Sequence, residues 1–301
     1  MKTSKFSLLS ALLIPALLLG ACSDDSTAGS ETQDPSITEI AVTNSQFSTL
    51  VGALQTTGLD AALDDDGEFT VFAPTNDAFD ALPDGTLESL SEAQLEEILL
   101  YHVLGSEVFS GQLGAEQAVE SLAGEEIFVT AGSEGVTVNG AASVTSADIE
   151  ARNGVIHVIN QVVLPDAYGT IVDNASKRYF LSSLVDAVVQ ADLADALLGD
   201  GPFTVFAPTN EAFAAIADVA SDLTVEQLSD VLLYHVIQGE VLSTDLQSEQ
   251  QVTTLNGNQI TIEVSGGAAT INGSAGITTV DIEGVNGVIH VIDQVLLPPT
   301  E

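Results

Sequence analysis

This chain of 301 residues has one cysteine, one methionine, no tryptophan and only five basic residues. A single cysteine excludes a disulfide within the chain. Forty-four Asp and Glu residues give a formal net charge of −39 at pH 7. Because phosphate contacts need a basic face, this charge excludes nucleic acid as a partner. Hydrophobic residues still make up 45% of the chain, which predicts globular domains with aliphatic cores.

The N-terminus has the pattern of a targeting segment. Two lysines precede an apolar run at residues 6–19, which is too short and wrongly flanked to span a membrane. The run ends at Leu19-Gly-Ala-Cys22, which resembles a bacterial lipobox. We therefore expect residues 1–21 to be a lipoprotein signal peptide and Cys22 to be the lipid attachment site. The alternative is an ordinary secretory signal with an incidental cysteine.

The segment that follows is polar and acidic. Residues 22–35 cannot bury a core and are expected to form an acidic flexible tether. Lipid chains hold a protein on a membrane surface without spanning it. We therefore expect a lipid-anchored protein of the cell envelope, at the outer membrane or cell surface, with the membrane as one partner.

Most of the chain consists of two similar sequence repeats. The spacing between the copies is 134 residues for the first repeated segment and 133 for the others. This is the length of a whole domain, far beyond the roughly 20–50 residues of a solenoid repeat. We predict two tandem domains at 36–165 and 168–298. The repeated pairs are 67–79 with 201–213, 99–103 with 232–236, and 153–159 with 286–292.

Each copy has helical patterns first and short strand patterns last. An opening helix is indicated by apolar residues at i, i+3, i+4 and i+7 from Phe47 and again from Leu181. Ser91 and Thr224 begin capping-box sequences, each ahead of a second apolar helix. The last half of each copy consists of short β-runs. This order predicts an α+β fold, with a sheet wedge or sandwich covered by several helices.

Three motifs resemble one known family. Phe-Thr-Val-Phe-Ala-Pro-Thr-Asn-(Asp/Glu)-Ala-Phe resembles the first signature of the fasciclin domain, and Asn-Gly-Val-Ile-His-Val-Ile resembles its second. Tyr-His after an apolar helix resembles its middle motif. The three occur in order in both copies, so the resemblance covers nearly all of the chain after the tether. It implies a compact β-wedge module, extracellular adhesion or matrix interaction, and no cofactor.

All four histidines lie in the repeated motifs. His157 and His290 lie in runs that are apolar on both strand faces, so we expect them to be structural core residues. The alternative is a metal ligand or a catalytic base. Neither copy has His-x-x-x-His spacing or a nearby cysteine, so we predict no metal site.

The Tyr-His motif has two possible roles. In animal members of the family that it resembles, this motif and its apolar neighbours are proposed contacts for adhesion receptors. Tyr101, His102, Tyr234 and His235 are therefore candidate adhesion or structural residues. Their apolar surroundings favour core tyrosines whose hydroxyl groups are satisfied at the surface.

The remaining sequence features concern calcium binding and catalysis. Asp64-Asp-Asp66 lacks the alternating pattern of an EF-hand loop and is expected to be a solvated turn, with calcium binding as the alternative. Nucleophile-elbow, Walker, dinucleotide and His-Glu-x-x-His patterns are also missing, so no enzyme is expected. The predicted function is adhesion to matrix protein, other cells or envelope polysaccharide. A small-ligand or metal-binding protein with a histidine-lined pocket is the alternative, and a hydrolase is the third.

Overall fold

A computed structural model describes residues 34–83, 85–220 and 222–299. The expected signal peptide, Cys22 and the tether up to residue 33 lie outside these residues. The chain from Asp34 onward forms one compact unit. Among the residues that the structure describes, no helix has both the length and the apolarity needed to cross a membrane.

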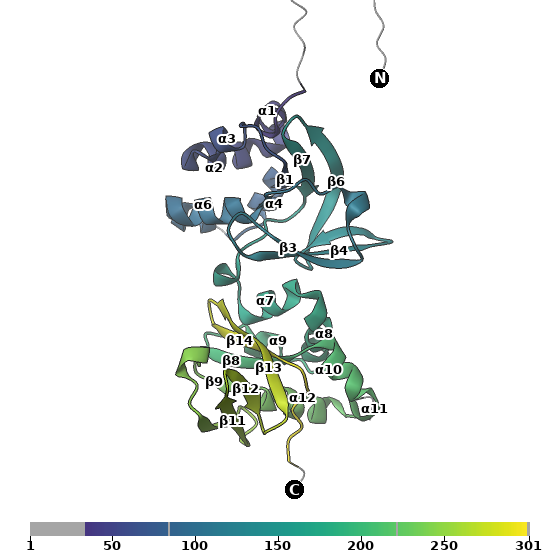
Figure 1. Ribbon diagram of the computed structural model, residues 1–301, viewed down its shortest axis with the longest axis vertical. Coiled ribbons are helices and arrows are strands. Elements are labelled where there is room, and N and C mark those ends of the chain that lie inside the picture. Colours follow the sequence, from purple (N-terminus) through teal and green to yellow (C-terminus); the bar gives the residue numbers. More distant parts are fainter. Residues whose placement is uncertain (1–33, 84, 221, 300–301) are drawn as a thin grey trace, which may run out of the picture. The chain divides into compact units, whose positions relative to one another are not determined.

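The first domain begins with helices and ends with strands (Figure 1). Its α-helices are α1 (Ile37–Thr43), α2 (Ser48–Thr57), α3 (Leu59–Ala62), α4 (Asn76–Asp80), α5 (Thr86–Ser89) and α6 (Glu92–Tyr101), with short 3-10 turns η1 (Ser45–Phe47) and η2 (Ser110–Gln112). Its strands are β1 (Phe69–Pro74), β2 (Val103–Leu104), β3 (Glu116–Glu120), β4 (Glu126–Gly132), β5 (Gly135–Val138), β6 (Ala142–Ala151) and β7 (Gly154–Ile159).

The second domain repeats this order. Its helices are α7 (Ile171–Lys177), α8 (Ser182–Gln190), α9 (Ala194–Leu197), α10 (Asn210–Ala215), α11 (Ala217–Ala220) and α12 (Val225–Tyr234), with 3-10 turns η3 (Asp166–Tyr168), η4 (Tyr179–Leu181) and η5 (Ser243–Asp245). Its strands are β8 (Phe203–Pro208), β9 (Val236–Gln238), β10 (Glu249–Thr253), β11 (Gln259–Ser265), β12 (Ala268–Ile271), β13 (Ala275–Gly284) and β14 (Gly287–Ile292).

Each domain has one seven-stranded mixed sheet. The order is β2-β1-β7-β6-β5-β4-β3 in the first domain and β9-β8-β14-β13-β12-β11-β10 in the second. Only the β1–β7 and β8–β14 pairs are parallel, and all other neighbours are antiparallel. The N–H of Leu122, just after β3, donates to the carbonyl of Val103 in β2 at 2.8 Å. The sheet therefore curls until its two ends meet.

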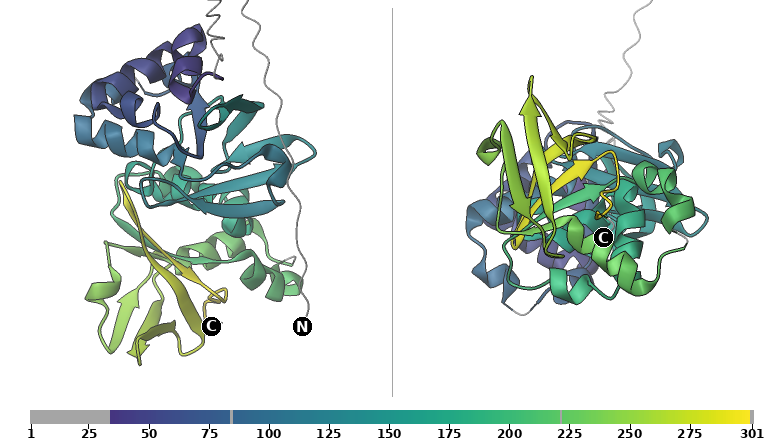
Figure 2. Two further views of the ribbon diagram at one scale, coloured as in Figure 1. Left: turned by 45° about the horizontal axis from the view of Figure 1, so that its top comes forward. Right: turned by 90° about the horizontal axis from the view of Figure 1, so that it is seen from below.

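The curled sheet separates two cores in each domain. In the first domain, Ile156 and Val158 of β7 pack on the helical side with Leu50 of α2. Ile159 faces the other way and packs with Ile127 of β4. Figure 1 and the left view of Figure 2 show the helices of this domain on one side and β4 and β6 on the other. Each domain is α+β, as the sequence predicts.

Local sequence signals explain the helix starts. Ser91 and Thr224 form capping boxes at α6 and α12, as the sequence predicts. Thr75 caps α4, whereas the side chain of Asn76 accepts a hydrogen bond from the backbone of Thr49 in α2. One serine cap and two threonine caps thus set where these helices begin, and Asn76 ties α4 to α2.

The Asn153-Gly154 pair at the start of β7 is required by close packing. Gly154 has φ of 148°, and a Cβ there would lie 2.0 Å from the carbonyl oxygen of Phe69 on the parallel neighbour. Asn153 accepts a hydrogen bond from the N–H of Ile37 at 3.0 Å and donates to the carbonyl of Leu63 at 2.7 Å. This pair therefore joins the first helix and the loop before β1 to the sheet.

Candidate functional site

The tyrosines of the Tyr-His motif lie inside the domains. Tyr101 is 0% exposed, and its hydroxyl donates to the carbonyl of Glu126 at 3.0 Å. The same hydroxyl accepts a hydrogen bond from Asn139 Nδ2 at 2.9 Å. Burial raises the pKa of Tyr101. The expectation of a hydroxyl at the surface is therefore wrong, because a buried asparagine supplies the partner that water would have supplied.

Tyr234 repeats this arrangement in the second domain. Its hydroxyl donates to the carbonyl of Gln259 at 3.1 Å and accepts from Asn272 Nδ2 at 3.1 Å. Asn139 and Asn272 both have positive φ, near 51° and 52°, a conformation that asparagine tolerates better than most residues. In this structure each tyrosine hydroxyl is hydrogen-bonded to the sheet region of its own domain and is not available to a partner protein.

His102 and His235 close the helices that precede them. His102 Nδ1 lies 2.7 Å from the carbonyl of Ile98, and Nε2 accepts a hydrogen bond from the N–H of Val163 at 3.1 Å. His235 makes the same two bonds, to Val231 and Leu296. Because Nε2 accepts, the proton lies on Nδ1 and the ring is neutral. Burial lowers the pKa of both histidines to about 4.

His157 holds a bulge in β6. Its Nδ1 accepts from the backbone N–H of Asp148 at 3.2 Å, and its Nε2 donates to the carbonyl of Val108 at 2.8 Å. Asp148 has φ of 58° and stands at a register shift between β6 and β7. The Asp148 carboxylate accepts hydrogen bonds from the backbone and hydroxyl of Ser110, which lower its pKa. His290, Asp281 and Ser243 repeat this cluster.

Serine, aspartate and histidine therefore meet in each domain, but not as a catalytic triad. In a triad the histidine lies between the serine hydroxyl and the carboxylate, and it takes the hydroxyl proton. Here Ser110 donates directly to Asp148, while both His157 nitrogens bond to the backbone. The imidazole thus has no free nitrogen for the hydroxyl. The geometry is that of a braced β-bulge.

The acidic turn of the first domain contains an ion pair. Arg152 contacts the carboxylate of Asp64 at 3.2 Å and that of Asp66 at 3.3 Å. The second domain has Val285 in place of this arginine. Within the described part of the chain, no three His, Cys, Asp or Glu side chains gather as metal ligands would.

The other two described basic residues surround one carboxylate. Lys177 Nζ lies 3.0 Å from Asp166 Oδ1, and an Arg178 nitrogen lies 2.6 Å from Asp166 Oδ2. Both basic side chains are buried. Burial lowers the pKa of Lys177, and Asp166 opposes that effect in part. Burial would raise the pKa of Asp166, but its two basic neighbours together hold it below the ordinary value.

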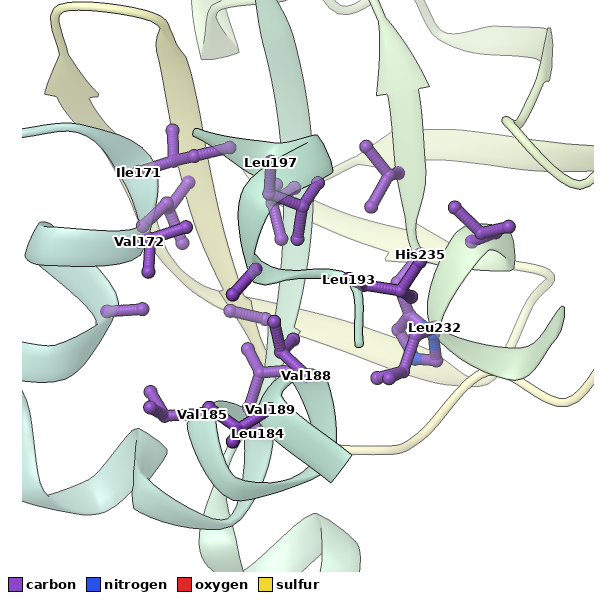
Figure 3. A pocket seen from close by; sticks show the side chains of 17 residues that line it. Ile171, Val172, Leu184, Val185, Val188, Val189, Leu193, Leu197, Leu232 and His235 are labelled. Atoms are coloured by element: carbon purple, nitrogen blue, oxygen red, sulfur yellow. The ribbon is translucent and has the colours of Figure 1, made fainter. Parts of the chain in front are cut away.

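An apolar cavity lies between the helices and the sheet of the second domain (Figure 3). Its volume is about 50 Å³, and every residue that lines it is aliphatic except His235. Figure 3 shows side chains of α7, α8 and α9 converging with Leu232 and His235. Since both nitrogens of His235 are bonded to backbone, the ring gives the cavity a carbon surface. The matching cavity of the first domain, lined in part by His102, measures about 20 Å³.

A comparison with known families assigns both domains. The Fasciclin domain matches residues 45–165 and again residues 180–298. The chain belongs to the fasciclin domain family. A solved fasciclin (FAS1) domain pair from the insect cell adhesion molecule Fasciclin I aligns with a TM-score of 0.61. The alignment covers 85% of this chain and 98% of that one at 21% identity, which supports the fold.

Relatives with fasciclin domains occur in animals and bacteria. Periostin from Homo sapiens is 34% identical over 217 residues, which cover 71% of this chain and 25% of periostin. Protein sll1483 from Synechocystis is 50% identical over 133 residues, which cover 43% of this chain and 73% of that protein. The part of this chain that aligns with periostin thus covers about a quarter of the length of periostin.

Sequence reasoning missed the polar partners of the motif residues. Asn139 and Asp148 bond to Tyr101 and His157 across 38 and 9 residues, which no local pattern indicates. The available signal was the repetition itself, since Asn139-Gly and Asp148 recur as Asn272-Gly and Asp281 at the offset of 133.

Proposed function

We propose that this chain is a lipid-anchored adhesion protein of the cell envelope. Its fasciclin domains bind extracellular matrix protein, neighbouring cells or envelope polysaccharide. The observation that carries the proposal is the tandem of two complete fasciclin domains. The insect protein whose domain pair has the same fold is a cell adhesion molecule.

The interior chemistry supports binding without catalysis. His102 and His157 each use both ring nitrogens on backbone groups, and Tyr101 bonds only to an asparagine and a carbonyl. A general base needs a free nitrogen or carboxylate within reach of a substrate proton. These motif residues therefore maintain the fold, and we assign recognition to the exterior of the domains.

The charge on the surface of the domains determines which kind of partner can bind. All three basic residues in the described ranges take part in ion pairs with Asp64, Asp66 or Asp166. The remaining carboxylates therefore give the surface a negative potential, which repels anionic partners. A neutral polysaccharide or a basic face of a matrix protein fits this surface best.

Anchoring and duplication add to the strength of attachment. A lipid on Cys22 would hold the domains at the membrane, and residues 22–35 would let them reach outward. Two weak sites on one chain raise avidity because the second site binds at a high effective concentration. We therefore expect attachment to depend on the presence of both domains.

The test compares surface attachment of cells that carry three forms of the protein. These are the full chain, a chain without residues 168–298, and a chain in which those residues are replaced by a second copy of 36–165. Deletion should weaken attachment at least tenfold, and the replacement should restore most of it. A glycan and matrix-protein array then identifies the partner.

Two results would contradict the proposal. Equal attachment by the single-domain form would remove the avidity argument. Turnover of a substrate by the purified protein would replace adhesion with an enzymatic function.

A further inference from the structure

The two domains differ where their helices meet the sheet. Phe47 and Leu54 line the small cavity of the first domain. Leu181 and Val188 stand at the equivalent positions of the second domain, at the repeat offset of 134 residues. Both replacements remove side-chain volume. This difference agrees with cavity volumes of about 20 Å³ in the first domain and about 50 Å³ in the second.

The rim of the cavity also changes from polar to apolar. In the first domain Thr38 Oγ1 donates a hydrogen bond to the carbonyl of Asp60 at 3.1 Å, which joins α1 to α3. The equivalent residues of the second domain are Val172 and Ala194, which line its cavity. Val172 has no hydroxyl group to donate to the backbone carbonyl of Ala194. The link that joins the two helices of the first domain therefore has no side-chain counterpart in the second.

An exposed valine extends this apolar surface outward. Val189 lines the cavity and is 65% exposed, whereas the first domain has the polar Gln55 at this position. Covering this side chain with an apolar ligand would remove apolar surface from water, which is favourable. The second domain thus has an apolar path from solvent to the cavity.

The charges on the surrounding helices restrict the ligand. Four exposed carboxylates lie on or between α7, α8 and α9, the helices that line the cavity, and the two basic residues of this domain are paired with Asp166. An anionic head group would meet repulsion with no cation to offset it. These carboxylates are Asp173, Asp186, Asp192 and Asp195.

We propose that this cavity binds the end of an uncharged hydrocarbon chain. Cavities lined only by apolar atoms stay dry and accept apolar molecules, and a cavity of about 150 Å³ holds benzene. A volume of about 50 Å³ suits the last carbons of a chain, with the remaining carbons lying on Val189 and its neighbours. This site is independent of adhesion and lies in the second domain.

The test uses residues 23–301, which contain every described residue, and three ligands of equal chain length. 1-Octanol, octylammonium and octanoate are titrated while methyl NMR signals of valine and leucine are recorded. Octanol should produce saturable shifts at Val188 and Leu232. Octanoate should bind at least tenfold more weakly than octanol or octylammonium, because the helices that line the cavity carry exposed carboxylates.

Matched variants decide whether the cavity is the site. Val188→Leu inserts the residue of the first domain and should weaken octanol binding at least tenfold, while the other methyl signals show that the fold is intact. Val189→Gln should weaken it by removing the apolar rim. Leu54→Val makes the reverse change in the first domain and should leave octanol binding at Val188 unchanged.

Three outcomes would overturn the inference. The first is the lack of saturable octanol shifts in the parent protein. The second is unchanged octanol binding in the Val188→Leu variant. The third is octanoate binding more tightly than octanol, which would mean that the site recognises a carboxylate.

Discussion

His102 and His235 should make each domain lose stability as the pH falls from about 6.5 to about 4. Burial lowers the pKa of both folded side chains from 6.5 to about 4. In this interval the unfolded chain binds a proton at each histidine and the folded chain does not. Stability therefore rises with pH across the interval, and the contribution is complete above the unfolded pKa.

The size of the effect follows from the two pKa values. One pKa unit corresponds to about 1.4 kcal/mol, so the full difference at one histidine is about 3 kcal/mol. At pH 5 the unfolded imidazole is almost fully protonated, and the loss relative to pH 7 is about 2 kcal/mol for each domain. That is a large share of the roughly 5–15 kcal/mol by which a domain is stable.

The assay compares urea unfolding at pH 7 and pH 5 for the parent and two variants. His235→Gln removes the titrating ring but keeps a donor and an acceptor, so its free energy of unfolding should fall about 2 kcal/mol less between these pH values than the parent's. Leu232→Ala is the control, because it weakens the same helix without changing any titration. Protonation of the many carboxylates affects all three proteins alike and cancels in the comparison.

An NMR titration of the histidine rings provides the direct check. The folded His235 signal should stay in its neutral form until the pH approaches 4. A folded midpoint near 6.5, or equal pH dependence in His235→Gln and Leu232→Ala, would refute the argument that buried imidazole controls acid stability.

Three further predictions test the ion pairs, the anchor and the surface charge. Asp166→Asn leaves two buried cations without their carboxylate and should lower the free energy of urea unfolding by about 2–4 kcal/mol. Arg152→Gln removes an exposed ion pair and should lower it by less than about 1 kcal/mol. Equal losses would contradict this ranking. Cys22→Ser should release the protein from membranes or leave its precursor uncleaved, as fractionation and mass measurement will show; normal processing with membrane retention would reject the lipobox interpretation. The melting temperature should rise with NaCl concentration, because the screening length shortens from about 30 Å at 0.01 M to about 3 Å at 1 M. A chloride-free salt is the control. A melting temperature that stays flat or falls would contradict mutual repulsion of the carboxylates.

The local parts of the fold could be predicted because their signals are local. Capping boxes mark α6 and α12, and an apolar run on both faces marks β7, all six residues of which are buried. The sheet order could not be predicted in the same way. β1 lies between β2 and β7, and the latter pairing joins residues 85 positions apart, such as Phe69 and Gly154. Long-range pairing of this kind leaves no periodic pattern in the sequence.

The buried charges and the cavity were also beyond the reach of sequence patterns. Lys177 and Arg178 would be placed at the surface by composition alone, yet Asp166 makes their burial possible. A cavity depends on whether neighbouring side chains fill the space between helix and sheet. Its volume depends on the packing of many residues together, so no single residue such as Val188 predicts it.

Comparison of the two copies supplies some of what one domain sequence lacks. Tyr101, His102 and Asp148 recur unchanged in the second copy, and the structure shows why: each bonds to backbone or to a partner that recurs with it. Positions at the surface are free of that constraint, and there Gln55 becomes Val189. Identity between the copies therefore marks what the fold requires. Differences mark where the two domains are able to recognise different ligands.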